Sequence, residues 1–505
     1  MLLTSAAILF AGPTALAFFS GGYFEDPRLV AGMVAWALVL VVALAGSRPL
    51  PASAPGWAAF GGLAFLTVWT AASLTWAPVS TPATDAVQRS LLYLGVLVAA
   101  TGVLRLGEVR RALEPVLALG IVVVIGYGLT ERLLPGVVDL ARSTGAGGRL
   151  EQPITYWNSE GALAAIGLVL CARLAGDSTR PTMIRSLAAA ACAALGMGVY
   201  LSYSRGAIAA AVVGLIVLLA ASPTRLQLRG VGLAVVAGIV AGACSAALPG
   251  VASLSGSSSE QQRDGAIMLA ILVVVMGAAA LAAARAARAP GTEGARIDRL
   301  SFAHRLPAVA ALAVALTVAG LVLGGLGERG DRDSPRFARA SPSRLTSVES
   351  RRYDYWRIGV DAFVREPLTG VGAGGFRAEW LRERPVEGGV REVHSLELGM
   401  ATELGLPGLF ALLIALGGVG VAGRRALRGG QPLAAGCCAA STVWLLHASI
   451  DWDWELPAVT LPAIIMAGGL IAASEVATQR TLYETSSPRR RRRSATGTRE
   501  EPVEA

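Results

Sequence analysis

The sequence lacks lysine altogether and is poor in charge of either sign. All 44 basic residues are arginine, and charged residues make up 16% of the chain, against about 25% in a typical soluble domain. Histidine occurs three times and cysteine five times, and every cysteine lies within an apolar run. These shortages exclude a soluble globular protein, a disulfide framework and a thiol-rich zinc site.

Hydrophobic residues, by contrast, make up 54% of the 505 residues. Apolar runs long enough to cross a bilayer recur from residue 2 to residue 474, and a chain in hydrocarbon must satisfy its backbone within helices. The pattern predicts an all-α, polytopic transmembrane helical bundle of about 12 to 14 spans. The fourteen apolar runs are 2–20, 29–46, 57–76, 90–106, 114–130, 158–176, 185–202, 205–222, 230–248, 265–284, 306–326, 405–423, 432–449 and 456–474.

Arginine is distributed in a way that predicts the orientation of the chain. If the arginine-rich tail at 489–493 is cytoplasmic, every second connection should be basic, and six connections fit. We therefore expect both termini in the cytoplasm, and we attribute the net charge of +9 to this rule rather than to nucleic-acid binding. The arginines in question are Arg48, Arg105, Arg110, Arg111, Arg173, Arg180, Arg185, Arg225, Arg229, Arg285, Arg288, Arg296, Arg299, Arg305, Arg424, Arg425 and Arg428.

The predicted organisation has two long extracytoplasmic connections. The larger contains an amphipathic pattern at 347–366, with Tyr353, Trp356, Val360 and Phe363 on one face, which predicts a helix on the membrane surface or against the bundle. The run at 2–20 has no basic residue before it, so we expect a span rather than a signal peptide. The expected units are N-terminal spans at 1–130, a loop at 131–157, central spans at 158–326, a large loop at 327–404, three C-terminal spans at 405–474 and a disordered tail at 475–505.

Polar side chains gather at the predicted outward ends of four spans and are nearly absent from span centres. Polar groups that remain in a membrane protein despite their cost mark functional sites. Because the predicted topology puts these four segments on one side, we expect them to converge on one extracytoplasmic cavity. The segments are 156–160, 203–206, 394–403 and 447–455.

Two residues stand out within these segments. Arg205 begins an apolar helix, where the helix N-terminus favours an anion such as phosphate, although an arginine at this position can also extend to lipid headgroups. His394 opens a helix and has a side chain suited to accept a proton from an alcohol, although a purely structural histidine is equally compatible. Its spacing to Glu397 and Glu403 does not place all three on one helical face, which disfavours zinc.

Two further segments have simpler interpretations. The glycine-rich segment 367–376 lacks the Gly-Lys-Ser/Thr of a nucleotide-binding loop, so its glycines indicate tight turns. The alternating acids and tryptophans at 451–455 fit an aromatic belt at the membrane interface, with the acids facing water.

Taken together, these motifs resemble the O-antigen ligase and polymerase family of membrane glycosyltransferases. The resemblance is strong across roughly residues 150–475 and extends to the order of the motifs and the long loop before the histidine. The motifs are Tyr203-Ser204-Arg205-Gly206-Ala207, Tyr355-Trp356, Pro367 to Gly374 with Phe376, His394-Ser395-Leu396-Glu397, and Glu403-Leu404-Gly405-Leu406-Pro407-Gly408.

The resemblance implies transfer of a glycan from a polyprenyl-diphosphate carrier, such as undecaprenyl diphosphate, to a hydroxyl acceptor on a lipid, a glycan or a protein. The reaction would take place on the outer face of the cytoplasmic membrane, in cell-surface polysaccharide assembly, with no cofactor, metal or nucleotide sugar. By position, Arg205 would bind the diphosphate and His394 would be the essential histidine. Whether the chain acts as a ligase or a polymerase stays open.

The remaining site residues follow from these two. Glu397 is expected to orient the imidazole of His394. Arg351 or Arg352 is expected to supply a second phosphate contact. Tyr203, Tyr156 and Asn158 complete the predicted substrate site.

Two alternatives compete with this hypothesis. A transferase that uses polyprenyl-monophosphate sugars would depend on Glu25 or Asp26 in the first outward loop and would not need His394. A polysaccharide or lipid transporter would use polar groups or broken helices near the middle of the membrane, and the sequence shows neither clearly.

Overall fold

The computed structural model describes residues 1–45, 48–288, 352–385 and 388–486 of the chain. Within these ranges every element of secondary structure is helical, which confirms the predicted all-α fold. Ten of the described helices are long and apolar enough to cross a membrane, and three more are apolar but shorter. Thirteen of the fourteen predicted spans overlap one of these helices, and the span predicted at 306–326 lies outside the described residues. The chain is therefore a multi-pass membrane protein.

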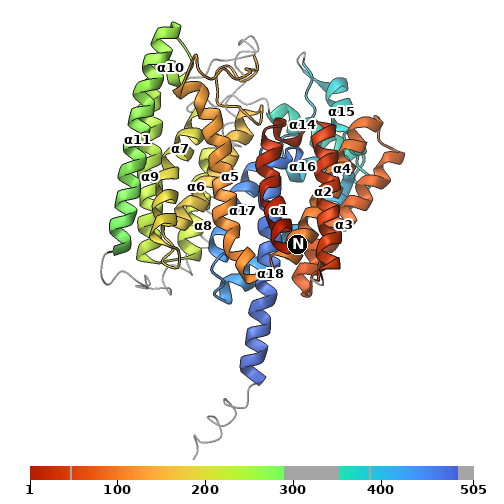
Figure 1. Ribbon diagram of the computed structural model, residues 1–505. Helices are drawn as coiled ribbons and strands as arrows, with labels where there is room; N and C mark the ends of the chain where they lie inside the picture. Colours follow the sequence, from red (N-terminus) through yellow and green to blue (C-terminus); the bar gives the residue numbers. More distant parts are fainter. Residues whose placement is uncertain (46–47, 289–351, 386–387, 487–505) are drawn as a thin grey trace, which may run out of the picture.

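The long helices stand side by side as a bundle, and the short helices α10, α14 and α15 lie at one end of it (Figure 1). The long helices are α1 (Leu2–Ala17), α2 (Glu25–Leu44), α3 (Ala54–Ala72), α4 (Ser80–Val103), α5 (Gly107–Leu133), α6 (Trp157–Ala175), α7 (Thr182–Leu201), α8 (Arg205–Ala221), α9 (Arg225–Ala246), α11 (Ser258–Arg288), α16 (Leu396–Arg428), α17 (Ala434–Ala448) and α18 (Pro457–Ser486). The short ones are η1 (Ser20–Gly22), η2 (Ser73–Thr75), α10 (Pro249–Ala252), α14 (Arg352–Arg365), α15 (Phe376–Glu383) and η4 (Asp453–Glu455).

Small residues allow the helices to approach one another closely. A Cβ added to Gly62 of α3 would lie 2.6 Å from the backbone nitrogen of Ala415 in α16. The same holds where Gly196 of α7 faces Gly238 of α9, since a Cβ on Gly196 would lie 2.2 Å from the Gly238 Cα. Close packing through glycine is the usual basis of helix association in a bilayer, where lipid is as apolar as the side chains.

Helix α16 differs from the predicted span at 405–423 because it begins earlier and is kinked. Its residues 396–404, expected within the large loop, are helical, and Gly405 then takes a left-handed conformation (φ 65°) that breaks the helix direction. The glycine-rich segment braces this kink: the Val371 N–H donates to the Thr402 carbonyl (3.0 Å) and the Gly372 N–H to the Glu403 carbonyl (2.9 Å). A Cβ on Gly405 would lie 2.5 Å from the Leu368 carbonyl oxygen, so only glycine fits there.

Two other predicted features differ in the structure: the packing face of the amphipathic helix and the start of the tail. The amphipathic helix is present as α14, but it packs through Ile358, Gly359 and Ala362, whereas Tyr353 and Val360 of the predicted face are exposed. The tail expected to be disordered from residue 475 is helical as far as Ser486, because α18 continues beyond the predicted end of its span. Residues 347–351 and 487–505 lie outside the described residues.

Candidate active site

The four polar segments meet at the end of the bundle that carries α14, α15 and the start of α16, at the top of Figure 1. The Tyr156 hydroxyl donates to Asp451 (2.8 Å), and the Ser204 hydroxyl lies 3.3 Å from Nε2 of His447. The Ser449 hydroxyl donates to Glu397 (2.8 Å). These contacts link helices α6, α8, α16 and α17 into one polar site.

His394 occupies the centre of this site in an unusual backbone conformation. Its φ is 60°, in the left-handed region that few residues other than glycine, asparagine and aspartate adopt, and Ser395 after it caps α16 by accepting from the Leu398 N–H (3.4 Å). The imidazole ring lies against the ring of Tyr355, with centroids 5.0 Å apart, and 6.3 Å from the ring of Trp452. The left-handed turn directs the ring back toward these aromatic side chains instead of along the helix.

The protonation of the His394 ring follows from one hydrogen bond. Nδ1 lies 2.9 Å from the Glu392 carbonyl oxygen, and since a carbonyl only accepts, Nδ1 carries the hydrogen. In a neutral imidazole Nε2 is then left with a lone pair. Burial of the ring lowers the pKa of His394 and outweighs the nearby Asp451 carboxylate, which acts in the opposite direction. His394 is therefore a neutral base with Nε2 available to accept a proton.

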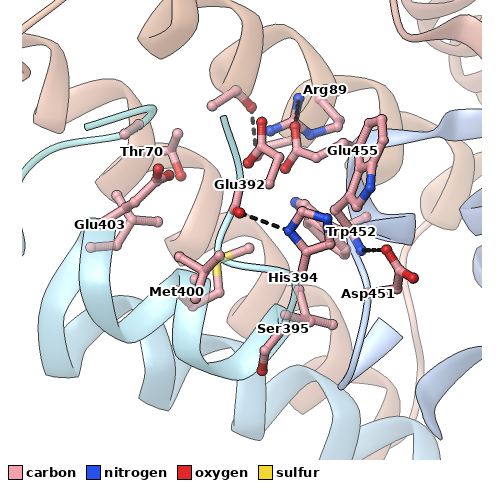
Figure 2. A pocket seen from close by; sticks show the side chains of 18 residues that line it. Thr70, Arg89, Glu392, His394, Ser395, Met400, Glu403, Asp451, Trp452 and Glu455 are labelled. Atoms are coloured by element: carbon pink, nitrogen blue, oxygen red, sulfur yellow. Dashed lines mark hydrogen bonds and ion pairs between the residues drawn. The ribbon is translucent and has the colours of Figure 1, made fainter. Parts of the chain in front are cut away.

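A small polar pocket surrounds His394, and Figure 2 shows the ring between Glu392, Trp452 and Asp451. Its volume is about 50 Å³, enough for a few water molecules or for the hydroxyl group of an acceptor. On the far side, Arg89 of α4 forms an ion pair with Glu455 (2.6 Å). Burial raises the pKa of Glu392, and the neighbouring carboxylates of Glu455 and Glu403 raise it further.

Arg352 approaches the site from α14 and forms an ion pair with Asp451. Asp451 also accepts a hydrogen bond from Tyr156, whose hydroxyl oxygen in turn accepts one from the Asn158 amide (2.8 Å). Burial alone would raise the pKa of Asp451, but the positive charge of Arg352 and the hydrogen bond from Tyr156 lower it. Of the two arginines predicted as a second phosphate contact, Arg352 is thus at the site, and Arg351 lies outside the described residues.

Arg205 is the first residue of α8, and its side chain is exposed. The preceding Ser204 caps the helix by accepting from the Ala207 N–H (3.2 Å). Tyr203 has φ 50°, and its buried hydroxyl donates to the Ala252 carbonyl (3.3 Å), so this hydrogen bond anchors the turn to α10. The arginine therefore projects from a rigid helix N-terminus, where the backbone N–H groups add to the attraction for an anion.

Glu397 does not have the contact predicted for it. Its carboxylate accepts from Ser449, while the hydrogen bond that holds the His394 ring comes from the Glu392 main chain. The orienting role therefore passes from a side chain to a carbonyl oxygen, which no side-chain pattern in the sequence reveals.

Segment 451–455 lies in the polar site, as expected for the polar segment 447–455, and its acids are not where an aromatic belt would put them. It is not an aromatic belt with acids facing water: Asp451 and Asp453 are buried, and each acid pairs with a basic side chain from another helix.

The residues of the alternative hypothesis lie elsewhere. Glu25, in the first turn of α2, accepts a hydrogen bond from Gln88 (3.2 Å). Asp26 lies at the edge of an apolar groove between α1 and α2. Across the described ranges, no three or more histidine, cysteine, aspartate or glutamate side chains are grouped to hold a metal ion.

Comparison with known proteins identifies the family. Residues 189–413 match the family model described as O-antigen ligase, a range that includes Arg205, Arg352 and His394 but not segment 451–455. A search of curated proteins finds no match. The chain thus carries an O-antigen ligase family domain at 189–413, which supports a membrane function of O-antigen ligase or polymerase type.

Proposed function

We propose that the protein transfers a glycan from a polyprenyl-diphosphate carrier to a hydroxyl acceptor, with His394 as general base and Arg205 and Arg352 as diphosphate-binding residues. The observation that carries the proposal is the tautomer of His394. Its Nδ1 hydrogen is committed to the Glu392 carbonyl, which leaves Nε2 as the acceptor of a ring that lines the pocket.

The reaction is a single displacement. The acceptor oxygen attacks the anomeric carbon of the glycan, its proton passes to Nε2 of His394, and the bond between the anomeric carbon and the diphosphate oxygen breaks. The polyprenyl diphosphate leaves with an additional negative charge. Guanidinium groups stabilise such a charge with paired hydrogen bonds, so Arg205 and Arg352 assist departure without a metal ion. Direct attack inverts the anomeric configuration.

Arg352 has a partner that the donor must replace. Its ion pair with Asp451 keeps the guanidinium ordered at the edge of the pocket. A diphosphate that approaches Arg352 competes with Asp451 for it, and the released carboxylate, close to His394, then favours the imidazolium that forms as the proton is taken. Arg205, at a helix N-terminus, supplies the second positive group.

A donor pair tests the proposal. The purified protein would be given the same glycan on a polyprenyl diphosphate and on a polyprenyl monophosphate, with a hydroxyl acceptor. We expect transfer from the diphosphate carrier alone, release of one polyprenyl diphosphate per bond formed, and an inverted product. Preferential use of the monophosphate carrier, or retention of configuration, would refute the mechanism.

We also propose that this end of the bundle is extracytoplasmic, because the arginine-rich connections lie at the opposite end. In a chain whose five native cysteines are replaced, Val137→Cys, which is highly exposed beside the site end, should react with an impermeant thiol reagent applied from outside. Ser178→Cys, exposed between α6 and α7, should not. The reverse pattern would invert the assigned orientation.

A further inference from the structure

Each acid of segment 451–455 pairs with a different basic side chain. Asp451 pairs with Arg352, Asp453 with His447 and Glu455 with Arg89. The two intervening tryptophans pack against different aromatic rings: Trp452 contacts Tyr156, and Trp454 contacts Tyr93. The segment thus ties four helices together, and one of its contacts leads to Arg205.

A chain of hydrogen bonds connects Asp453 to the start of α8. One carboxylate oxygen of Asp453 lies 2.5 Å from Nδ1 of His447, and the other accepts from the Ser159 hydroxyl (2.6 Å). Nε2 of His447 lies 3.3 Å from the Ser204 hydroxyl. His447 is 1% exposed and Asp453 0%, so neither side chain reaches a substrate.

The direction of these bonds can be assigned from the donors available. Nδ1 of His447 donates its hydrogen to Asp453, because a carboxylate oxygen only accepts. The Ser204 oxygen accepts the Ala207 N–H and also pairs with Nε2 of His447. Each side chain in this hydrogen-bonded series has a partner, and a buried network in which all members are hydrogen-bonded fixes one conformation.

The first turn of α8 also rests directly on the His447 ring. A Cβ added to Gly206 would lie 3.3 Å from Cδ2 of His447 and 2.7 Å from Cδ1 of Ile450. Gly206 therefore allows the turn that carries Arg205 to lie against the ring. In this motif Ser204 caps the helix, Arg205 is the functional side chain and Gly206 contacts His447.

We infer that Asp453 and His447 are positioning residues that hold Arg205, through Ser204, in the orientation that binds the carrier diphosphate. The inference rests on the proposed function of Arg205. It assigns a role to two buried residues that lie outside the matched family domain. Displacement of a binding group by about 1 Å can lower the rate or affinity of an enzyme by a large factor. Loss of the network should therefore weaken binding of the donor.

The test measures the affinity of purified variants for a polyprenyl diphosphate without glycan, together with KM for the acceptor. Asp453→Asn and Ser204→Ala should each weaken carrier binding by about tenfold and leave acceptor KM unchanged. The matched control is Thr224→Ala, because Thr224 caps α9 in the same way, accepting from the Gln227 N–H (3.1 Å), at the opposite end of α8. The control variant also loses a helix cap, so its free energy of unfolding should fall by a similar amount while it binds the carrier normally.

A double-mutant cycle separates positioning from general destabilisation. If Asp453 and Ser204 are links in one chain, the double variant should bind the carrier about as weakly as either single variant, because one break already releases Arg205. Effects that multiply to about a hundredfold would show two independent roles and overturn the inference. If Asp453→Asn does not purify, the Ser204→Ala and Thr224→Ala comparison decides by itself, since equal carrier affinity in the two would contradict positioning.

Arg205→Ala in the same assay distinguishes failure of the proposed function from failure of the positioning inference. If this variant binds the carrier normally, the proposed function of Arg205 is wrong. If Arg205→Ala binds weakly while Asp453→Asn and Ser204→Ala bind normally, the proposed function stands and the positioning inference alone is wrong.

Discussion

The two segments that carry the proposed chemistry, Tyr203-Ser204-Arg205 and His394-Ser395-Leu396, share one local architecture. In each, a residue with positive φ precedes a serine, the serine accepts a hydrogen bond from the N–H three residues later, and a helix begins. The functional side chain is the residue after the cap in the first segment and the residue before it in the second. One backbone motif thus presents an exposed cation from a helix N-terminus and a half-buried base from a turn.

The two segments differ in what holds the functional side chain. The His394 ring is fixed by the Glu392 carbonyl, two residues away, whereas the cap beside Arg205 is bonded to His447, 243 residues away. The chemical group is therefore set locally, and the binding group depends on the packing of α8 against α17. The orientation of the binding group should therefore be sensitive to distant substitutions, whereas the hydrogen bond that fixes the tautomer of His394 should not.

The largest effect is expected at His394. His394→Asn keeps a residue that tolerates positive φ but removes the base, so folding and carrier binding should be preserved while turnover falls by a factor on the order of 100 to 10,000. The rate at saturating donor and acceptor is the measurement. His394→Ala adds backbone strain to the same loss, and a stability difference between the two variants would report that strain.

Arg205 should give the next largest effect, on binding. Arg205→Ala should weaken carrier binding by a factor on the order of 10 to 100, the usual worth of hydrogen bonds to a charged group. Arg205→Lys should be nearly as damaging because an ammonium group lacks the planar fork that contacts two phosphate oxygens. Wild-type affinity in the lysine variant would reduce Arg205 to a general positive charge, and wild-type affinity in the alanine variant would favour contact with lipid headgroups.

The capping serines give a smaller effect that sharpens the comparison. Ser204→Ala and Ser395→Ala should each lower the free energy of unfolding by about 1 kcal/mol. Only Ser204→Ala should also weaken carrier binding, because only its hydroxyl is shown to connect a functional residue to the distant His447. Thermal unfolding and carrier binding of both variants provide the check, and equal carrier affinity would remove the proposed difference between the segments.

The sequence predicts the bundle well because apolar length and arginine placement report directly on the membrane. Thirteen helices overlap predicted spans for this reason. The motifs at Arg205 and His394 also stand out, since a cation and a base at helix starts are locally visible. The sequence does not predict the Glu392 carbonyl as the partner of His394, because main-chain contacts leave no mark on residue type.

The partners of the acids in segment 451–455 are not predictable from the sequence, for a different reason. Aspartates beside tryptophans at the end of a span have a simple explanation in the membrane interface. Two of their partners, Arg352 and Arg89, come from helices far away in the chain, and only the packing of α4 and α14 against the segment brings them together. Tertiary contacts of this kind follow from the fold and not from local pattern.

The smallest effect is expected in the pH dependence. Burial lowers the pKa of His394, and the base must be unprotonated to act, so activity should fall as the pH decreases through a value below 6.5, the ordinary pKa of the side chain. Asp451→Asn removes a negative charge that favours the imidazolium, so this limb should move to still lower pH. The pH-rate profiles of both proteins are the measurement. A limb above 6.5 would contradict the protonation state inferred from the structure.

The division of labour between the two segments is tested most directly by single-turnover transfer with the carrier-linked glycan already bound. His394→Asn and Arg205→Ala would be compared at saturating acceptor, with donor affinity measured separately for each. The account predicts that His394→Asn binds the donor like the unmodified protein and transfers it at least a hundredfold more slowly, whereas Arg205→Ala binds weakly. Normal single-turnover transfer by His394→Asn, or normal donor binding by Arg205→Ala, would contradict it.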